Sequence, residues 1–301
     1  MLIERLVLGT ARVTGGASAR EGHDLVPAAL DGGVRHVDTA PSYGMGTAET
    51  VVGEALRRFG GEVSVTTKLG SRRDPLAYPK TWLRRIKRLV APPAPAGDDP
   101  RDYRLPEPLT VPTGNDFSAG AMRESLRRSL DALGRIDRLL LHDVTAAQYD
   151  TGLAAALAGL GAEAGAQVGY ATRTLFDPAL DAHFAPLAVG QCMPLPAWLS
   201  ASPPPLPDRP LALHSLVHLM DHLRHGDTAF SGALDAAAAR LPGDGAAARL
   251  ACFYAWTAAR LPDARLIYAT TRRDRLDGFL RAVHAIDREG PVREWASRLA
   301  L

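Results

Sequence analysis

The stretch that decides the fold reads VRHVDTAPSYGMGTAE, residues 34–49. It begins as a short apolar strand, places Asp38 and Tyr43 directly after that strand, and continues into a helix with Glu49 in its first turn, where the helix dipole favours an anion. Two further apolar runs end in the same way: residues 63–67 are followed by Lys68, and residues 138–141 by His142. Reactive side chains at the ends of successive strands predict the rim of an active site.

The rest of the chain repeats this alternation between β-type apolar runs and segments with helical spacing. Strands are predicted at residues 6–8, 34–38, 63–67, 136–141, 167–170, 187–191, 211–214 and 265–269, and helices at 24–31, 48–59, 119–133, 154–164, 246–260 and 273–286. No GxGxxG follows any of these strands, and about eight strand and helix units favour a closed (β/α)8 TIM barrel over an open sheet. We therefore predict a single barrel domain over residues 1–301, with its active site at the C-terminal ends of the strands.

Composition excludes several classes of function. The chain carries 35 Lys and Arg against 33 Asp and Glu and has no basic stripe, so we predict no nucleic-acid partner and no binding to a membrane surface. Cys192 and Cys252 form no CxxC pair and the nine histidines lack metal-ligand spacing, so no metal site is predicted. With no apolar run of membrane-spanning length and no signal-like start, the sequence predicts a cytoplasmic protein. It does not indicate an oligomeric state.

Residues 69–117 interrupt the alternation as a long insertion between the third strand and its helix. Seven prolines between Pro92 and Pro112 exclude a continuous helix there. Because long loops in compact domains are usually functional or disordered, and because this one follows a strand at the predicted catalytic face, we expect a lid or a wall of the substrate pocket. Trp82, Tyr103 and Leu105 are its candidate contacts.

The four residues at the strand ends, Asp38, Tyr43, Lys68 and His142, could act together in a proton transfer. A phenol with its ordinary pKa of about 10 is a poor acid at neutral pH, but a nearby ammonium favours the phenolate, and a carboxylate can hold that ammonium in place. Tyr43 is therefore a candidate general acid tuned by Lys68 and Asp38, while a neutral His142 could orient a substrate carbonyl. Protonating a developing alkoxide also requires a hydride donor, which no side chain supplies, so the set implies a bound cofactor.

These residues resemble the aldo-keto reductase family. The resemblance rests on Gly9-Thr10-Ala11, on the pattern that runs from Asp38 to Gly53, on Lys68, and on the run LLLH ending at His142. It implies an NADPH-dependent reductase on an eight-stranded barrel, which converts an aldehyde or ketone into an alcohol or catalyses the reverse. Tyr43 would be the general acid, Lys68 and Asp38 its tuning pair, and His142 the group that positions the carbonyl. The substrate itself is not indicated.

The resemblance also implies a set of cofactor contacts, several of them substituted. Thr172 stands where a Ser-Asn pair usually meets the nicotinamide, Gln191 matches the family glutamine, and His214 replaces the stacking aromatic residue. The turn ATTRRDRL, residues 269–276, resembles the phosphate-binding turn of the family, and its arginines favour NADP(H) over NAD(H). The candidate cofactor-binding residues are Thr10, Thr172, Gln191, His214, Thr270, Thr271, Arg272 and Arg275.

Two functions of different classes stay open. The first is an active carbonyl reductase or alcohol dehydrogenase acting on a small molecule. The second is a catalytically weak or inactive barrel that serves as a nucleotide-binding or regulatory module, as the altered residues Ala171, Thr172 and His214 suggest. The intact four-residue set at the strand ends favours the first, because a protein that does not catalyse has no physical need for a phenol tuned by a lysine.

Overall fold

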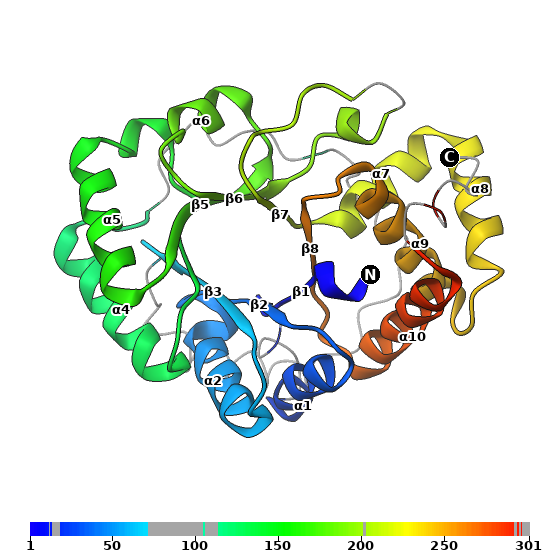
Figure 1. Ribbon diagram of the computed structural model, residues 1–301, viewed down its shortest axis with the longest axis horizontal. Helices are drawn as coiled ribbons and strands as arrows, with labels where there is room; N and C mark the ends of the chain where they lie inside the picture. The colour runs from blue at the N-terminus through cyan, green and yellow to red at the C-terminus, as the bar shows by residue number, and fades with distance from the viewer. Residues whose placement is uncertain are drawn as a thin grey trace, which may run out of the picture.

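A computed structural model describes residues 1–11, 13, 19–71, 105, 114–200, 203–291, 294 and 296. Its strands are parallel and close into a barrel in chain order, as Figure 1 shows in a view along the barrel. This confirms the predicted (β/α)8 architecture. The strands are β1 (Leu6–Gly9), β2 (His36–Asp38), β3 (Ser64–Leu69), β4 (Arg138–His142), β5 (Gln167–Leu175), β6 (Val189–Met193), β7 (Leu211–Leu213) and β8 (Arg265–Tyr268).

Helices surround the ring of strands (Figure 1). Helices α6, α7 and α8 were not predicted from the sequence, and α1 begins five residues before its predicted start. Three helices, α7 to α9, lie between β7 and β8. The helices are α1 (Ala19–Asp31), α2 (Ala48–Phe59), α4 (Ala119–Leu133), α5 (Thr151–Ala164), α6 (Pro178–His183), α7 (Leu216–Gly226), α8 (Thr228–Ala238), α9 (Gly245–Arg260) and α10 (Arg273–Glu289).

The main hydrophobic core lies between the strands and the helices. Successive side chains of a strand point to opposite faces, so Leu139 and Leu141 of β4 pack outward into this layer while Leu140 points into the barrel. The interior contains a small apolar cluster of Leu140, Ala171 and Val189. Polar side chains of β2, β3 and β4, namely Asp38, Thr66 and Arg138, line a cavity in the same interior.

The predicted insertion follows β3, which ends at Leu69, and precedes α4, which begins at Ala119. Its two described ends meet: the backbone N–H of Asp116 donates to the carbonyl of Gly70 over 2.9 Å. Gly70 has a φ of +94°, and a Cβ atom there would lie 2.1 Å from the ring of Phe117, so only glycine fits this junction. Leu105 is half-buried and packs against the core, whereas Trp82 and Tyr103 lie outside the described residues.

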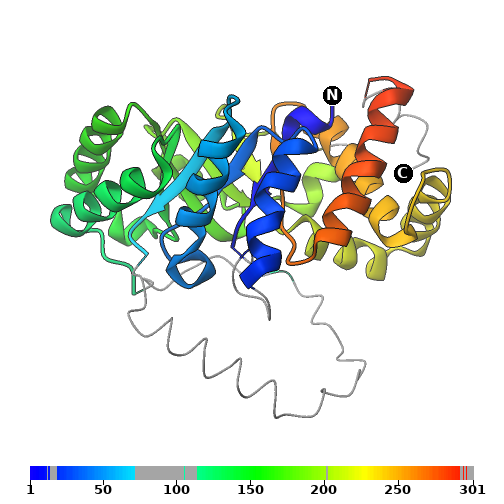
Figure 2. The same ribbon diagram turned by 90° about the horizontal axis from the view of Figure 1, so that it is seen from below.

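The short 3-10 helix η1 (Ile3–Arg5) directly precedes β1 and therefore lies at the N-terminal rim of the barrel. Figure 2, a side view, shows it at the upper edge. Across the described ranges, the helices are all too short or too polar to cross a membrane.

Candidate active site

Four predicted side chains come together at the C-terminal end of the barrel. Asp38 and His142 are the last residues of β2 and β4, Lys68 is the last but one of β3, and Tyr43 opens the 3-10 helix η2 (Tyr43–Gly46). The Nζ atom of Lys68 lies 4.6 Å from the centre of the Tyr43 ring. The rings of Tyr43 and His142 meet edge to face with their centres 5.7 Å apart. The strand order thus assembles residues that span more than a hundred sequence positions.

Lys68 and Asp38 form a buried ion pair. The Nζ of Lys68 donates to Asp38 Oδ1 at 2.7 Å and Oδ2 at 2.8 Å, and to the carbonyl of Thr39 at 2.9 Å. The exposed fraction is 1% for Lys68 and 3% for Asp38, so neither charge would be tolerated without its partner. Burial by itself lowers the pKa of Lys68, but the charge of Asp38 and the phenol of Tyr43 more than offset this and raise it. The ammonium is therefore charged at neutral pH and fixed in place.

The phenol of Tyr43 keeps its proton at neutral pH. Burial raises its pKa above 10, and the positive charge of Lys68 opposes this shift without reversing it. The ammonium of Lys68 does lower the pKa of the phenol, but desolvation outweighs this neighbouring charge. A protonated phenol next to an ammonium can donate a proton and have the resulting anion stabilised.

His142 is a neutral imidazole at this rim. Burial, followed by the charges of Lys68 and Arg173, lowers its pKa to about 3. Its Nδ1 atom is buried and has no hydrogen-bond partner in the described part of the chain. Its backbone carbonyl accepts from Asn115 Nδ2 at 2.5 Å. The ring lies edge to face against Tyr43, and a neutral imidazole at that position can offer a nitrogen to a substrate oxygen.

Several supporting residues were not singled out from the sequence. Asp143 adopts a φ of +50°, and its carboxylate accepts the backbone N–H of Arg173 over 2.9 Å, which links the ends of β4 and β5. Asn115 connects the returning end of the insertion to His142. The hydroxyl of Thr67 donates to buried Glu49 over 2.7 Å and ties α2 to β3. Only Glu49 had a sequence signal, its place in the first turn of a helix.

Three predicted cofactor residues come from β5, β6 and the end of β7. Thr172 and Gln191 are buried, and the Thr172 Oγ1 and Gln191 Oε1 atoms have no hydrogen-bond partner among the residues described. His214 Nε2 lies 2.6 Å from the carbonyl of Thr172. Since a carbonyl only accepts, Nε2 carries the proton, and burial lowers the pKa of this imidazole, so the ring is neutral. These three side chains and His142 therefore come from four consecutive strands of the barrel.

The remaining predicted cofactor residues follow β1 and β8. Thr10 is fully buried, and its hydroxyl donates to the carbonyl of Asp38 over 3.0 Å, so this group joins β1 to β2. Thr270 is buried and Thr271 half-buried, while Arg272 and Arg275 are exposed at the start of α10. The guanidinium of Arg272 pairs with Asp274, with its Nε 3.0 Å from Oδ1. A phosphate at this helix terminus would compete with that carboxylate.

A closed (β/α)8 barrel with its polar cluster at the C-terminal strand ends has the layout of a barrel enzyme. The model of the Aldo/keto reductase family matches residues 5–165, which is more than half of the chain. The chain belongs to the aldo-keto reductase family. The match ends before Thr172, Gln191 and His214, the region in which the sequence departs from the family pattern.

Individual relatives match over parts of their length. The chain is 34% identical to D-threo-aldose 1-dehydrogenase of Pseudomonas sp over 140 residues, 45% of this chain and 38% of that protein. It is 30% identical to pyridoxal 4-dehydrogenase of Microbacterium luteolum over 149 residues, 48% of this chain and 41% of that protein. The aligned region therefore spans less than half the length of either of these curated relatives.

Solved structures show the same fold over nearly the whole chain. A putative 2,5-diketo-D-gluconic acid reductase B has a TM-score of 0.59 at 20% identity, with 98% of this chain and 86% of that chain covered. An aldo-keto reductase from Klebsiella pneumoniae in complex with NADPH has a TM-score of 0.58 at 18% identity, with 99% and 94% covered. At such identities the likeness concerns the fold.

Proposed function

We propose that this protein is an NADP(H)-dependent oxidoreductase that reduces an aldehyde or ketone to an alcohol, or catalyses the reverse reaction. The observation that carries the proposal is the buried ion pair of Lys68 and Asp38 next to the protonated phenol of Tyr43. A buried ion pair contributes little net stability by itself, so its place beside a phenol is best explained by proton transfer. Membership of the family and the dehydrogenase names of the two relatives support this reading.

The residues present fit a nicotinamide cofactor. Thr172 Oγ1 and Gln191 Oε1 are buried acceptors without a partner in the described chain, and a carboxamide N–H could satisfy them. Thr271, Arg272 and Arg275 lie at the start of α10, where backbone N–H groups and cations suit a phosphate. The bound cofactor would supply or accept the hydride. The NADPH complex of the Klebsiella structure supports NADP(H) as its identity.

The side chains of the rim account for the movement of the proton. The neutral imidazole of His142 would orient the substrate carbonyl toward Tyr43. As the oxygen gains negative charge, the Tyr43 hydroxyl would transfer its proton to it, and the alcohol would form. Lys68 would stabilise the phenolate that is left, and Asp38 would keep Lys68 charged and in position. In the oxidation direction the same groups would accept the proton.

The insertion contributes a wall to the substrate pocket in this proposal. Asn115, at its returning end, bonds to the backbone of His142, and the Gly70–Asp116 hydrogen bond holds both ends at the same rim. The substrate in this proposal is a small carbonyl compound or alcohol.

Replacing Tyr43 by phenylalanine tests the mechanism. The substitution removes one hydroxyl and keeps the ring beside Lys68, so turnover should fall by about 10²–10⁴-fold, the usual contribution of a general acid. Affinity for NADPH, followed by tryptophan quenching and energy transfer, should change by less than about twofold because the phenol is not among the proposed cofactor contacts. Undiminished turnover of an aldehyde panel by the variant would remove Tyr43 from the mechanism.

The same titration of the unaltered protein separates the two classes of function. Saturable binding that is tighter for NADPH than for NADH supports the reductase. The pairing of Arg272 with Asp274 is the observation that favours the alternative, a weak or inactive barrel. If neither nucleotide binds, the cofactor site has been lost and the barrel is better described as a binding or regulatory module.

A further inference from the structure

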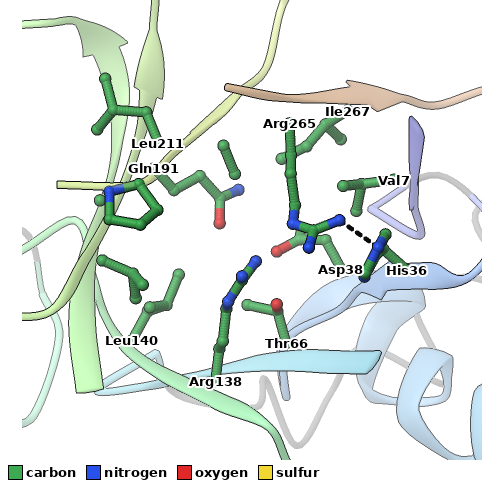
Figure 3. Close-up of a pocket in the computed structure, with 14 residues that line it drawn as sticks. Val7, His36, Asp38, Thr66, Arg138, Leu140, Gln191, Leu211, Arg265 and Ile267 are labelled. Carbon is green, nitrogen blue, oxygen red and sulfur yellow. Dashed lines mark hydrogen bonds between the residues drawn. The ribbon is translucent and has the colours of Figure 1, made fainter. Parts of the chain in front are cut away.

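A second group of charged residues lies at the opposite end of the barrel from Tyr43. His36, Arg138 and Arg265 are the first residues of β2, β4 and β8, so they lie at the N-terminal mouth of the barrel. All three line a cavity of about 20 Å³ that continues past Thr66 and Gln191 into the interior. Figure 3 shows Arg138 and Arg265 reaching toward one another from opposite sides of this pocket.

The two guanidinium groups face each other without a carboxylate between them. Arg138 and Arg265 are both half-buried, and Arg138 forms no hydrogen bond or salt bridge with the described residues. Asp137, the acidic neighbour of Arg138, is already bound to Arg135 and to the backbone N–H of Val65. Burial, followed by the charge of Arg138, lowers the pKa of Arg265, yet an arginine stays charged at any ordinary pH. The mouth therefore concentrates positive charge.

His36 adds a neutral donor to the same pocket. Its Nε2 atom contacts Arg265 Nη1, as the dashed line in Figure 3 marks. Because a guanidinium only donates, Nε2 must accept, and the ring proton is on Nδ1. That Nδ1 atom is buried and has no partner in the part of the chain that the structure describes. Burial, then Arg265 and Arg138, lowers the pKa of His36 to about 4, so the ring remains an uncharged N–H donor.

Acidic groups do not neutralise this pocket. Asp38 is the one carboxylate among its described lining residues, and both of its oxygens are bound to Lys68. Glu4 contributes only its backbone carbonyl, which accepts from Arg265 Nη1 over 3.4 Å. The charge of Asp137 acts on Arg138, but Asp137 makes its direct contacts elsewhere. Among the described residues, two guanidinium groups without a salt-bridge partner and an imidazole N–H without an acceptor therefore face this pocket, and these are groups that bind a negatively charged ligand.

We propose that the N-terminal mouth of the barrel binds an oxyanion, either a carboxylate or a phosphate group, between Arg138 and Arg265. Guanidinium groups bind both kinds of oxyanion through paired hydrogen bonds, and the anion would offset the repulsion between two like charges. The cavity has room for roughly one or two water molecules, so it would admit one or two oxygens of an oxyanion that enters from the mouth and would not hold a nucleotide. The two arginines lie at the N-terminal mouth, whereas the proposed phosphate contacts of the cofactor lie at the start of α10; Gln191 and Asp38 line the inner end of the same cavity.

The test compares the thermal stability of the full chain and of Arg138→Gln at equal ionic strength, with inorganic phosphate or acetate titrated against chloride. Without a bound oxyanion the variant should melt at a temperature at least as high as the unaltered protein, because one of two repelling charges is gone. Phosphate or acetate should then raise the melting temperature of the unaltered protein, while apparent affinity in Arg138→Gln falls by about tenfold or more. A rise in melting temperature with phosphate alone identifies a phosphate group as the ligand, and a rise with acetate alone identifies a carboxylate.

Two control variants show whether a rise in melting temperature comes from anion binding at the N-terminal mouth. Arg240→Gln removes an exposed arginine outside the barrel and should respond as the unaltered protein does. Arg275→Gln removes a cation from the start of α10. If Arg275→Gln loses the phosphate response and Arg138→Gln keeps it, the anion binds at the proposed cofactor site and the inference is wrong. Equal stabilisation of all four proteins, the result expected of a general salt effect, would also overturn it. NADPH should bind Arg138→Gln and the unaltered protein with the same affinity. If neither protein binds NADPH, the proposed function is wrong, and that result does not bear on the anion site.

Discussion

At the scale of single residues, position in the fold changes the chemistry of the side chains. Lys68 is fully buried yet keeps its charge because Asp38 supplies two carboxylate oxygens within 2.8 Å. Tyr43 lies beside that ammonium yet keeps its proton because desolvation outweighs the charge. The residue types and their order along the chain predicted which groups meet, but the balance between burial and charge depends on how deeply each one lies.

Removing Lys68 is therefore expected to damage the fold as well as catalysis. Lys68→Met leaves the carboxylate of Asp38 buried without a partner, which should lower the free energy of unfolding by about 3–5 kcal/mol. Urea denaturation measures this loss. The double variant Asp38→Asn with Lys68→Met should recover part of the stability, because both charges are then absent, while turnover stays low. A single Lys68→Met variant as stable as the unaltered protein would show that the pair is solvated.

At the scale of elements, one glycine sets how closely two helices approach. A Cβ atom on Gly53 of α2 would lie 1.9 Å from the carbonyl oxygen of Ala132 in α4. This contact is with backbone, which cannot move aside unless the helix moves. The glycine therefore fixes the spacing of two helices that cover β2, β3 and β4, the strands that carry Asp38, Lys68 and His142.

Gly53→Ala should accordingly lower the free energy of unfolding by about 1–3 kcal/mol, the usual cost of overpacking. The higher helix propensity of alanine, roughly 1 kcal/mol, works in the opposite direction and is outweighed. Gly159→Ala is the matched control, since it lies in α5, where an added Cβ atom would have no neighbour within 4 Å, and should be neutral or slightly stabilising. Chemical denaturation of both variants checks the difference, and equal stabilities would show that α2 and α4 can separate at little cost.

At the scale of the whole molecule, both mouths of the barrel contain a neutral histidine that resists protonation. Burial is the first cause for each, and it lowers the pKa of His36 to about 4 and of His142 to about 3. The unfolded chain would bind a proton at each site near pH 6.5, so between that pH and about 3–4 it binds more protons than the folded protein. Stability is therefore greatest above pH 6.5 and falls as the solution is acidified.

The pH dependence of unfolding tests this expectation. Each buried histidine should contribute a slope of at most about 1.4 kcal/mol per pH unit in the acidic window. His142→Asn should reduce the slope by one proton. A slope that is the same in His142→Asn and in the unaltered protein would mean that His142 is protonated as readily in the folded state as in the unfolded state.

The sequence alone predicted the order of the eight strands and the helices with strong apolar spacing, because hydrophobic periodicity is a local property of the chain. It missed α6, which has six residues, and it missed α7 and α8, which follow one another with only Asp227 between them. It also predicted that Asp38, Tyr43, Lys68 and His142 share one rim, since parallel strands end at the same face.

Only the tertiary structure placed Asn115 and Asp143 against that rim and brought His36, Arg138 and Arg265 together at the other mouth. His36, Arg138 and Arg265 open three different strands, Asp143 follows β4, and Asn115 lies shortly before α4. Nothing local in the sequence marks any of them. Their proximity depends on how far each strand is staggered in the closed barrel, and that stagger is set by packing across the whole molecule.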